Sequence, residues 1–319
     1  MRSIGVLTSG GDAPGMNAAV RAVVRSAIAN GFKVYGIRDG YNGLIKNDVM
    51  ELNRSSVSKI INRGGTVIYT ARCLEFKSKE GVLKGKKTCE DLGIEGLVVI
   101  GGDGSFRGAA DLSASGIPCV GIPATIDNDI ACTDYTIGYD TAINTVVDMV
   151  DKLRDTCNSH NRCSVVEVMG RRCGDLALNA GIACGATAII VPEIPFDFEK
   201  DILEKINDAI KCGKHHYIIM IAEGVGGSQE IAKKIEDITG IETRAAILAH
   251  VQRGGSPSGK DRIVATRMGD YAVNLLKEGI GNRVLALKGN DIVDYDIQEA
   301  LKMKKGIDKI LFDIAAKVG

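Results

Sequence analysis

The sequence predicts an α/β protein of two lobes, each a mostly parallel, Rossmann-like sheet with helices on both faces. Three observations support this: short apolar runs recur, helix-like segments lie between them, and glycine or a polar residue ends each run. The 319 residues are enough for two ordinary domains, and a hydrophobic content of 45% is enough to give each a core.

Eight apolar runs have the length and composition of buried strands. In chain order they are SIGVLTSGG, KVYGIRDG, GLVVIGGDGS, IPCVGIPAT, SVVEVMGR, TAIIVPE, HYIIMIAEG and TRAAILAHV. Because helical segments separate them, the strands should run parallel, and their number indicates two sheets. No Pro- or Ser-rich linker marks a boundary, which fits lobes joined by several chain crossings.

Three segments between these runs carry apolar residues at helical spacing: MNAAVRAVVRSAIANG, DTAINTVVDMVDKLRDT and EKDILEKINDAIKCG. We expect Gly31 and Gly213 to end the first and third of these helices, since glycine adopts the left-handed conformation found after a helix. We expect Asp140 or Thr141 to cap the second.

Composition excludes several classes of protein. The net charge is +0, whereas a general nucleic-acid or membrane-surface binder needs a basic excess. No apolar stretch reaches the roughly 18 residues of a membrane span, and the chain enters a strand-like run without a leader segment. The nine cysteines form no CxxC pair, so we expect reduced thiols in a cytosolic chain, with Cys163, Cys173 and Cys184 in the core.

Parallel sheets bind ligands at the carboxyl ends of their strands, so the residues after each apolar run are the informative ones. SGGDAPGMN (9–17) joins a strand to a helix, and Gly10 and Gly11 let backbone N–H groups approach a phosphate at the helix N-terminus. The motif matches neither GxGxxG nor GxxxxGK[ST], so a plain tight turn stays open.

GGDGS (101–105) follows a second run. Gly102 and Gly104 leave room for a triphosphate, Ser105 offers a hydroxyl, and Asp103 is suited to hold Mg²⁺ directly or through water. A carboxylate beside a phosphate needs a cation, so the metal is part of this hypothesis. The alternative is an ordinary D-G turn.

PATIDND places two carboxylates after a third run. Asp127 is the candidate general base that accepts a hydroxyl proton, Thr125 is placed to bond the same substrate, and Asp129 belongs to the surrounding charge environment. The alternative is an Asx-turn with both acids in solvent.

Cationic side chains lie at the ends of several other runs, which favours an anionic, phosphorylated substrate over solvated surface residues. These side chains are Arg162, Arg171, Arg172, Arg244, His250 and Arg253. Glu223 follows HYIIMIA and either binds a sugar hydroxyl or caps the next segment. His160, His215 and His216 are interpreted as surface or effector residues.

In order and spacing, SGGDAPGMN, GGDGS, TIDND, MGR and HVQRGG resemble the bacterial ATP-dependent phosphofructokinases over essentially the whole chain. GGDG[ST] alone also occurs in NAD kinases and lipid kinases, but the five motifs together are specific. The resemblance implies a transferase of glycolysis, a 6-phosphofructokinase that moves a phosphoryl group from MgATP to the 1-hydroxyl of fructose 6-phosphate and forms fructose 1,6-bisphosphate.

The resemblance also implies the roles of individual residues. Asp127 would be the base, with Thr125, Arg171 and Arg72 beside it, and Asp103 would hold magnesium. The ATP site would contain Gly11, Arg72, Cys73, Gly102, Asp103, Gly104 and Ser105. The sugar phosphate would be bound by Thr125, Asp127, Arg162, Met169, Gly170, Arg171, Glu223, Arg244, His250 and Arg253.

The resemblance further implies domains and assembly. Residues 1–138 plus 251–301 would form a larger ATP-binding domain, and 139–250 plus 302–319 a smaller sugar-phosphate-binding domain. Arg162 and Arg244 match positions that reach a neighbouring subunit's site, so the enzyme should be a homo-oligomer, a tetramer by family expectation, in the cytoplasm. We expect no nucleic-acid or membrane partner.

The phosphoryl donor follows from two small residues. Pyrophosphate-dependent members of the family usually carry Asp where Gly104 stands and Lys where Ala124 stands. An Asp at 104 would crowd and repel the α-phosphate, so the sequence favours ATP, with pyrophosphate as the runner-up.

An allosteric pocket for ADP or phosphoenolpyruvate is implied by basic residues, namely Arg21, Arg25, Arg54, Arg154, Lys214 and His216. Three positions depart from the family pattern: Lys59 and Thr187 replace acids, and Cys212 replaces a basic residue. We expect reduced or absent ADP activation, since fewer acids should weaken binding of a magnesium nucleotide.

Two further hypotheses stay open. A non-catalytic sugar-phosphate sensor on the same fold would tolerate loss of Asp127 or Asp103, yet both are present. A nucleotide or lipid kinase that shares GGDGS would leave TIDND and HVQRGG unexplained.

Overall fold

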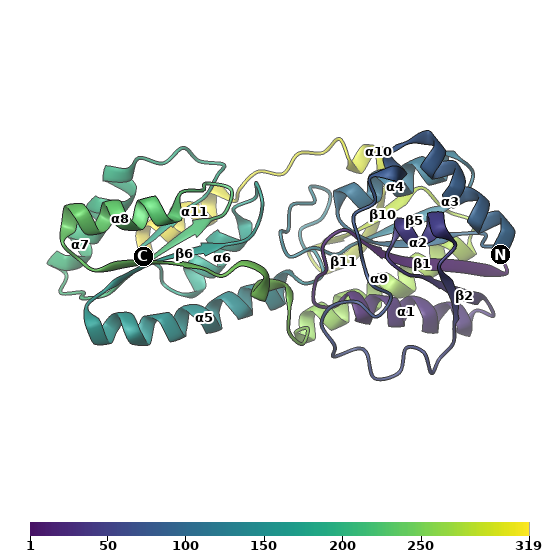
Figure 1. Cartoon of the computed structure of the whole chain (residues 1–319), viewed down its shortest axis with the longest axis horizontal. Helices are drawn as coiled ribbons and strands as arrows, with labels where there is room; N and C mark the ends of the chain where they lie inside the picture. Colours follow the sequence, from purple (N-terminus) through teal and green to yellow (C-terminus); the bar gives the residue numbers. More distant parts are fainter. Residues whose placement is uncertain (319) are drawn as a thin grey trace. The chain divides into compact units, whose positions relative to one another are not determined.

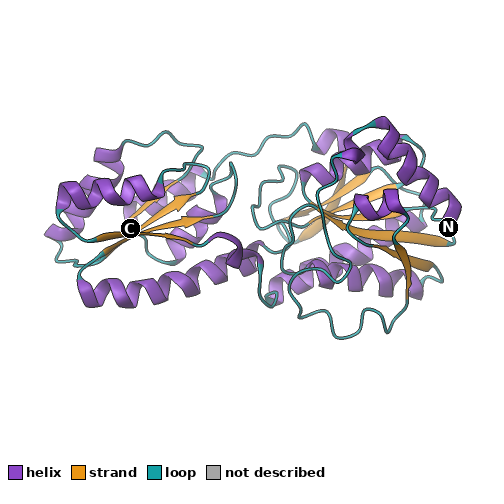
Figure 2. Ribbon diagram, in the orientation of Figure 1, coloured by secondary structure: helices purple, strands orange, loops and turns teal. Residues whose placement is uncertain are grey.

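The computed structural model describes residues 1–318, which fall into two compact units, each with strands enclosed by helices (Figures 1 and 2). The first unit comprises residues 1–125, 130–141 and 253–305. The second comprises 126–129, 142–252 and the described residues from 306 onward. The chain therefore passes between the units at several points.

The sheet of the first unit has seven strands within the described residues, in the order β11-β10-β5-β4-β1-β2-β3. The five central strands run parallel, and β3 and β11 pair antiparallel at the two edges. The strands are β1 (Ser3–Ser9), β2 (Lys33–Ile37), β3 (Val49–Leu52), β4 (Leu97–Gly101), β5 (Cys119–Pro123), β10 (Arg283–Lys288) and β11 (Asp291–Asp296).

Helices cover both faces of this sheet, α1 and α9 on one and α3 and α4 on the other (Figure 1). Gly269 of α9 lets α1 and α9 approach each other closely, since a Cβ at this position would lie 2.5 Å from the Cβ of Ala22 in α1. The helices are α1 (Met16–Ala29), α2 (Tyr41–Lys46), α3 (Lys79–Leu92), α4 (Asp103–Ala114), α9 (Gly259–Lys277) and α10 (Ile297–Ala300), with a 3₁₀ turn, η1 (Glu75–Lys77).

The second unit has an all-parallel sheet of four strands among the residues described, in the order β7-β8-β6-β9. Its strands are β6 (Cys163–Val168), β7 (Ala188–Ile190), β8 (Tyr217–Ala222) and β9 (Thr243–Ile247). Its helices are α5 (Tyr139–His160), which starts among residues of the first unit, α6 (Asp175–Ala183), α7 (Glu204–Lys211), α8 (Ser228–Thr239) and α11 (Lys309–Val318), with short helical turns η2 (Glu199–Leu203) and η3 (Ala249–Arg253).

Side-chain alternation along the strands gives this second sheet two apolar faces. Val166 and Met220 pack with residues of α5, α6 and α11, whereas Val165 and Ile219 pack with residues of η2, α7 and α8. Successive strand residues point to opposite faces, so a strand buried on both sides must be apolar throughout. The runs SVVEVMGR and HYIIMIAEG have this composition for that reason.

The predicted fold class is confirmed, and all eight predicted strands and all three predicted helices are present. Gly31 and Gly213 both have φ +80° just after α1 and α7, as expected. The capping prediction for α5 was wrong, because the helix begins at Tyr139 and residues 140 and 141 lie in its first turn.

The strands β3, β10 and β11 were missed. In β11, acidic residues alternate with apolar ones at the sheet edge, so the segment lacks a continuous apolar run. No helix among residues 1–318 combines the length and hydropathy that crossing a membrane requires.

Candidate active site

Two glycine-rich loops follow the adjacent parallel strands β1 and β4 of the first unit. After β1, Gly10 has φ +89°, a conformation that L side chains rarely adopt. After β4, Gly102 is the N-cap of α4 and Asp103 begins the helix. The loops are neighbours because parallel pairing places both strand ends at one edge of the sheet. A helix N-terminus at such an edge favours an anion.

The first turn of α4 is open around its two glycines. A Cβ at Gly102 or Gly104 would meet nothing within 4 Å, and the side chain of Asp103 is exposed. The buried hydroxyl of Ser105 donates to the carbonyl of Ser9, 3.1 Å away, a contact that was not expected from the sequence. In this structure that hydroxyl ties β1 to α4 instead of facing the open turn.

The loop that carries Arg72 and Cys73 crosses the end of β1. Thr8 donates its hydroxyl to the carbonyl of Tyr69 (2.7 Å), and Thr70 donates to the carbonyl of Gly10 (2.9 Å). Arg72 is exposed and Cys73 is half-buried. The hydroxyls of residues 8 and 70 therefore hold this loop beside the glycines after β1.

Arg253 also lies at the loop after β1. Its Nη1 donates to the carbonyl of Asp12 at 3.0 Å, and a Cβ on Gly11 would collide with its guanidinium group. The absence of a side chain at Gly11 is thus needed for this contact. Sequence reasoning assigned Arg253 to the sugar phosphate; in this structure its guanidinium bonds the loop after β1.

Thr125 follows β5 and is held through its backbone. The hydroxyl of Thr136 donates to its carbonyl at 2.6 Å, and the preceding residue, Ala124, forms a parallel bridge with Ile137. Thr125 is 8% exposed. The strand end that leads into the TIDND motif is therefore braced by the segment that follows the motif.

In the second unit, Asp127 faces Arg171. The carboxylate is fully buried, and its Oδ2 lies 3.2 Å from Nε of Arg171, whose side chain is about half exposed. Arg171 has φ +53°, and Asn128, the residue after Asp127, has φ +48°. Both residues therefore adopt the left-handed region of backbone conformation, which non-glycine residues rarely occupy. Unusual backbone conformations of this kind cluster at functional sites.

The backbone of the loop after β6 is held by buried or half-buried acceptors. Glu223, at the end of β8, accepts from the amides of Gly170 (3.1 Å) and Arg171 (2.6 Å). Gln252 accepts from the amide of Met169 at 3.1 Å. In this structure Glu223 therefore orients the loop that carries Arg171, in addition to the sugar contact predicted for it.

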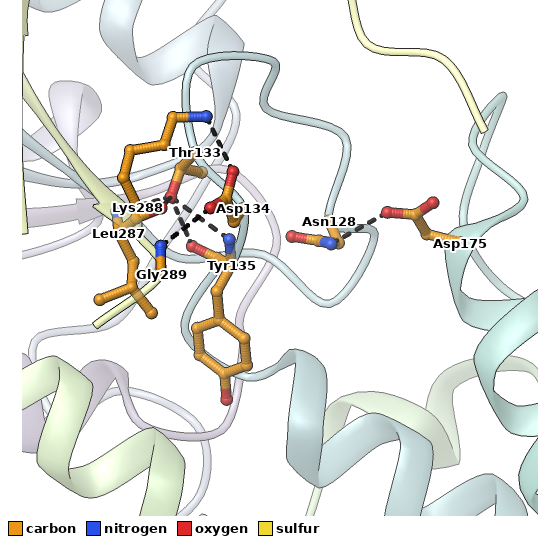
Figure 3. Close-up of polar contacts among 8 residues, drawn as sticks. All are labelled: Asn128, Thr133, Asp134, Tyr135, Asp175, Leu287, Lys288 and Gly289. Atoms are coloured by element: carbon orange, nitrogen blue, oxygen red, sulfur yellow. Dashed lines mark hydrogen bonds and ion pairs between the residues drawn. The ribbon is translucent and has the colours of Figure 1, made fainter. Parts of the chain in front are cut away.

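Asn128 connects the TIDND turn to the start of α6. Its amide donates to Oδ2 of Asp175 at 3.0 Å, and both residues are buried (Figure 3). Asp175 lies in the first turn of α6, where a carboxylate is favoured by the helix dipole. This contact fixes the residue next to Asp127.

The other predicted cations of the second unit lie on and around β9. Arg162 and Arg244 both bond Glu242, at 2.7 and 2.9 Å, and these bonds lower the pKa of the Glu242 carboxyl. His250 is exposed in the turn after β9. The structure thus brings Arg162 and Arg244 together through an acid that sequence reasoning did not select.

The predicted effector residues lie in both units. In the first unit, Arg21 and Arg25 share one face of α1. Burial of Arg21 and the nearby charge of Arg25 lower the pKa of Arg21. Arg54 is exposed. In the second, burial and the charges of Arg154 and Lys214 lower the pKa of His216. The last three residues therefore form one basic cluster.

Sequence reasoning missed four residues that hold the site, namely Asp175, Glu242, Gln252 and Asp261. Each lies near a recognised motif, but its partner is far away in the chain, as with Asn128 and Asp175. The sequence gives only weak evidence for these residues. Asp175 and Asp261 lie in the first turns of helices, where acidic residues are common whether or not they have a functional role.

The nine cysteines are all free thiols, and Cys163, Cys173 and Cys184 are buried as predicted. Within residues 1–318, no group of three or more His, Cys, Asp or Glu side chains is arranged to hold a metal ion. A protein-only metal cage is thus absent from the described part of the chain.

Comparisons with known proteins agree with the motifs. A sequence profile described as Phosphofructokinase matches residues 3–276. A Clostridium perfringens protein named ATP-dependent 6-phosphofructokinase 1 is 58% identical over 315 residues, covering 99% of this chain and 98% of its own. A Clostridium botulinum protein named ATP-dependent 6-phosphofructokinase is 57% identical with the same coverage.

Solved structures show the same fold. Phosphofructokinase from Saccharomyces cerevisiae has a TM-score of 0.88 and 35% identity; the match covers 100% of this chain and 47% of the yeast chain. A pyrophosphate-dependent phosphofructokinase from Marinobacter aquaeolei has a TM-score of 0.87, with 22% identity, over 97% of this chain and 86% of that one. Since the profile spans most of the sequence and the curated relatives are more than half identical over nearly all of it, this chain belongs to the phosphofructokinase family.

Proposed function

We propose that this chain is an ATP-dependent 6-phosphofructokinase, a glycolytic kinase that phosphorylates the 1-hydroxyl of fructose 6-phosphate. The observation that carries the proposal is the fully buried carboxylate of Asp127, placed after β5 and 3.2 Å from the Arg171 guanidinium. Family membership and relatives named for this reaction support it.

Asp127 is the general base in this proposal. Its carboxylate accepts the proton of the acceptor hydroxyl as that oxygen attacks the terminal phosphorus of the nucleotide. Arg171 beside it offsets negative charge on the transferring phosphoryl group. Thr125, two residues earlier, orients the acceptor.

The first unit would bind ATP. The glycines after β1 and β4 let backbone amides approach the phosphates, and the open first turn of α4 leaves room for them. The residues concerned are Gly11, Arg72, Cys73, Gly102, Asp103, Gly104 and Ser105.

Magnesium fits this turn. Asp103 is exposed at the N-terminus of α4, and Mg²⁺ is ordinarily held by one or two carboxylates together with substrate phosphates and water. When bound, the ion would neutralise charge on the phosphates of ATP.

ATP is favoured over pyrophosphate by the space at Gly104. A Cβ there would meet nothing within 4 Å, so the turn stays open to the nucleotide. Ala124 is buried beside Ile137 and offers no cation for pyrophosphate.

The second unit would bind fructose 6-phosphate through the loop after β6 and the turn after β9. Arg162 and Arg244 are held together by Glu242, and we propose that they serve a neighbouring subunit of a homotetramer. The remaining contacts would come from Met169, Gly170, Arg171, Glu223, His250 and Arg253. We further propose a cytoplasmic location, which fits nine free thiols.

For regulation, we propose that an anionic effector binds the basic cluster of Arg154, Lys214 and His216 in the second unit. Effector binding is also proposed, separately, for Arg21, Arg25 and Arg54 of the first unit. Thr187 is buried and Lys59 is a cation, so neither supplies the acid that a magnesium nucleotide prefers. ADP activation should be weak or absent, and a normal, magnesium-dependent activation curve would contradict this.

A coupled assay tests the proposal. Wild-type protein is supplied with ATP or pyrophosphate, and with fructose 6-phosphate or another sugar phosphate, with and without added ADP. We expect turnover with ATP and fructose 6-phosphate. Faster turnover with pyrophosphate would support the pyrophosphate-dependent enzyme, and substrate binding without any ADP production would support a non-catalytic sensor.

A further inference from the structure

Asp261 is a fully buried carboxylate to which the proposed chemistry assigns no role. It lies in the first turn of α9. Its Oδ1 accepts from the hydroxyl of Tyr135 (2.5 Å) and the amide of Gly138 (2.6 Å). Its Oδ2 accepts from the amide (3.0 Å) and the hydroxyl (2.5 Å) of Thr141.

These partners place Asp261 at the N-termini of two helices. Ser258 caps α9 by accepting from the amide of Asp261, and Thr141 is in the first turn of α5. Burial raises the pKa of the Asp261 carboxyl, and the bonds from Thr141, Tyr135 and Gly138 oppose that rise. A carboxylate that accepts from this many donors holds them in one arrangement, because each donor is costly to leave unpaired when buried.

The donors belong to one segment, residues 133–141, which we call the brace. The brace holds the end of β5 at two points. Thr136 donates its hydroxyl to the carbonyl of Thr125 at 2.6 Å, and the amide of Ile137 donates to the carbonyl of Pro123 at 3.0 Å. The strand end that leads directly into the TIDND motif is therefore fixed by the brace.

The start of the brace is fixed by the β10–β11 hairpin (Figure 3). Thr133 accepts from the amide of Leu287 at 2.8 Å, and Asp134 accepts from Lys288 Nζ (2.8 Å) and the amide of Gly289 (3.1 Å). The contact of Asp134 with Lys288 is partly in solvent, whereas the contact of Thr133 with Leu287 and the attachment at Asp261 are buried. The ion pair at Asp134 is thus the exposed part of these attachments.

We infer that Asp261 is a positioning residue, which holds the brace and through it the residue that orients the acceptor, Thr125. The expected effect on catalysis rests on the proposed function. The contacts that join Asp261, the brace and Thr125 do not depend on that function. Gly138 of the brace lies against Ala13 of the loop after β1, but that loop and the loop after β4 have hydrogen bonds of their own. Loss of Asp261 should therefore affect the acceptor more than the nucleotide.

The first test replaces Asp261 by Asn. An amide keeps one acceptor oxygen but turns N–H groups toward buried donors. We expect kcat/KM for fructose 6-phosphate to fall about tenfold, while KM for ATP changes by less than about twofold, because only the acceptor side loses its geometry. Equal losses for both substrates, or none, would overturn the inference.

A matched pair at Thr141 serves if Asp261→Asn does not fold. Thr141→Val removes the hydroxyl and keeps the shape, whereas Thr141→Ser keeps the hydroxyl. We expect Val to reproduce the fructose 6-phosphate defect and Ser to restore wild-type kinetics. Identical behaviour of the two variants would count against Asp261 as the anchor.

Amide hydrogen exchange tests the structural link without any assay of activity. Exchange at Ile137 and Gly138 should be faster in Thr141→Val than in Thr141→Ser, since opening of the brace exposes these amides. If wild-type protein does not phosphorylate fructose 6-phosphate, the proposed function fails, and the exchange comparison still decides whether Asp261 holds the brace. Unchanged exchange would refute the anchor even in an active enzyme.

Discussion

Two aspartates, Asp127 and Asp261, are both fully buried, yet their surroundings are of opposite kinds. Asp127 faces the guanidinium of Arg171, which is about half exposed to solvent. Asp261 faces hydroxyl and amide donors from Tyr135, Gly138 and Thr141. The carboxylate of Asp127 thus meets a partly solvent-exposed side chain, whereas that of Asp261 accepts hydrogen bonds from buried hydroxyl and amide groups.

The difference shows what burial alone does not determine. A carboxylate enclosed by several fixed neutral donors holds those donors in one arrangement, since each is costly to leave unpaired when buried, so it suits a structural anchor. A carboxylate beside a partly exposed cation can exchange that partner for a substrate hydroxyl, which is what a general base requires. We therefore propose Asp127 as the chemical residue and Asp261 as the structural one.

The largest expected effect is the loss of the base. Asp127→Ser should lower kcat by at least about 10²–10⁴ while substrate binding is kept, because the serine hydroxyl is a poor proton acceptor. Steady-state kinetics with ATP and fructose 6-phosphate measure this. By contrast, Asp261→Asn should lower the melting temperature more than Asp127→Ser does. Near-normal turnover of the serine variant would remove Asp127 from the role of base.

Arg171 can be displaced without being replaced. A Cβ at Gly224 would lie less than 3.0 Å from the carbonyl oxygen of Arg171, so Gly224→Ala must shift the Arg171 backbone and change its position relative to Asp127. Displacement of a catalytic group by about 1 Å can cost about 10²-fold in rate, and we expect a loss of kcat of this order.

Gly259→Ala is the matched control, because a Cβ there would meet nothing within 4 Å and alanine favours the helix in which it lies. Kinetics and melting temperature of both variants should be compared. A Gly224→Ala enzyme with wild-type kcat would show that the Asp127–Arg171 distance is unimportant for turnover.

A smaller effect is expected at the Asn128–Asp175 pair, which fixes the residue beside the base. Asp175→Ala removes the buried acceptor and should lower kcat about tenfold, because a lost buried hydrogen bond costs about 1–3 kcal/mol and loosens the turn. Asp175→Asn still offers an oxygen to Asn128 and should lose much less. If the two substitutions lower kcat equally, the charge at position 175 matters and the hydrogen bond does not.

The sequence predicted the parts of this comparison that depend on local pattern. Asp127 was identified because it follows an apolar run, where parallel strands present their ends, and the glycines near it mark the same edge. Asp261 was not identified, since its partners lie about 120 residues earlier and only the packing of α9 against α1 and β5 brings them together.

Local pattern also leaves second roles unpredicted at particular residues. The hydroxyl of Ser105 and the guanidinium of Arg253 were assigned to substrates, and in this structure both also bond backbone carbonyls near the end of β1. Polar side chains at a sheet edge face two demands, ligand binding and satisfaction of nearby backbone groups, and sequence does not distinguish them.

The smallest expected effect concerns a third aspartate, Asp134, which holds the outer end of the brace from the surface. Its bonds to Lys288 lower the pKa of the Asp134 carboxyl. A folded-state pKa below the unfolded value means that the stabilisation is present at neutral pH and is lost as pH falls below the ordinary aspartate value of 3.8. Both side chains are about half exposed, so the pair should contribute only about 0.2–1 kcal/mol to the free energy of unfolding.

Asp134→Asn should accordingly lower stability slightly at pH 7 and by less at pH 3, with kinetic constants unchanged at pH 7. Denaturant unfolding at both pH values measures this, and high salt at pH 7 should shrink the difference because exposed charges are screened. Asp134→Asn would contradict this expectation if it lowered kcat/KM for fructose 6-phosphate as much as Asp261→Asn does. The solvent-facing end of the brace would then control Thr125 as firmly as the enclosed end. In that case the difference between exposed and buried carboxylates would not explain which of them positions the site.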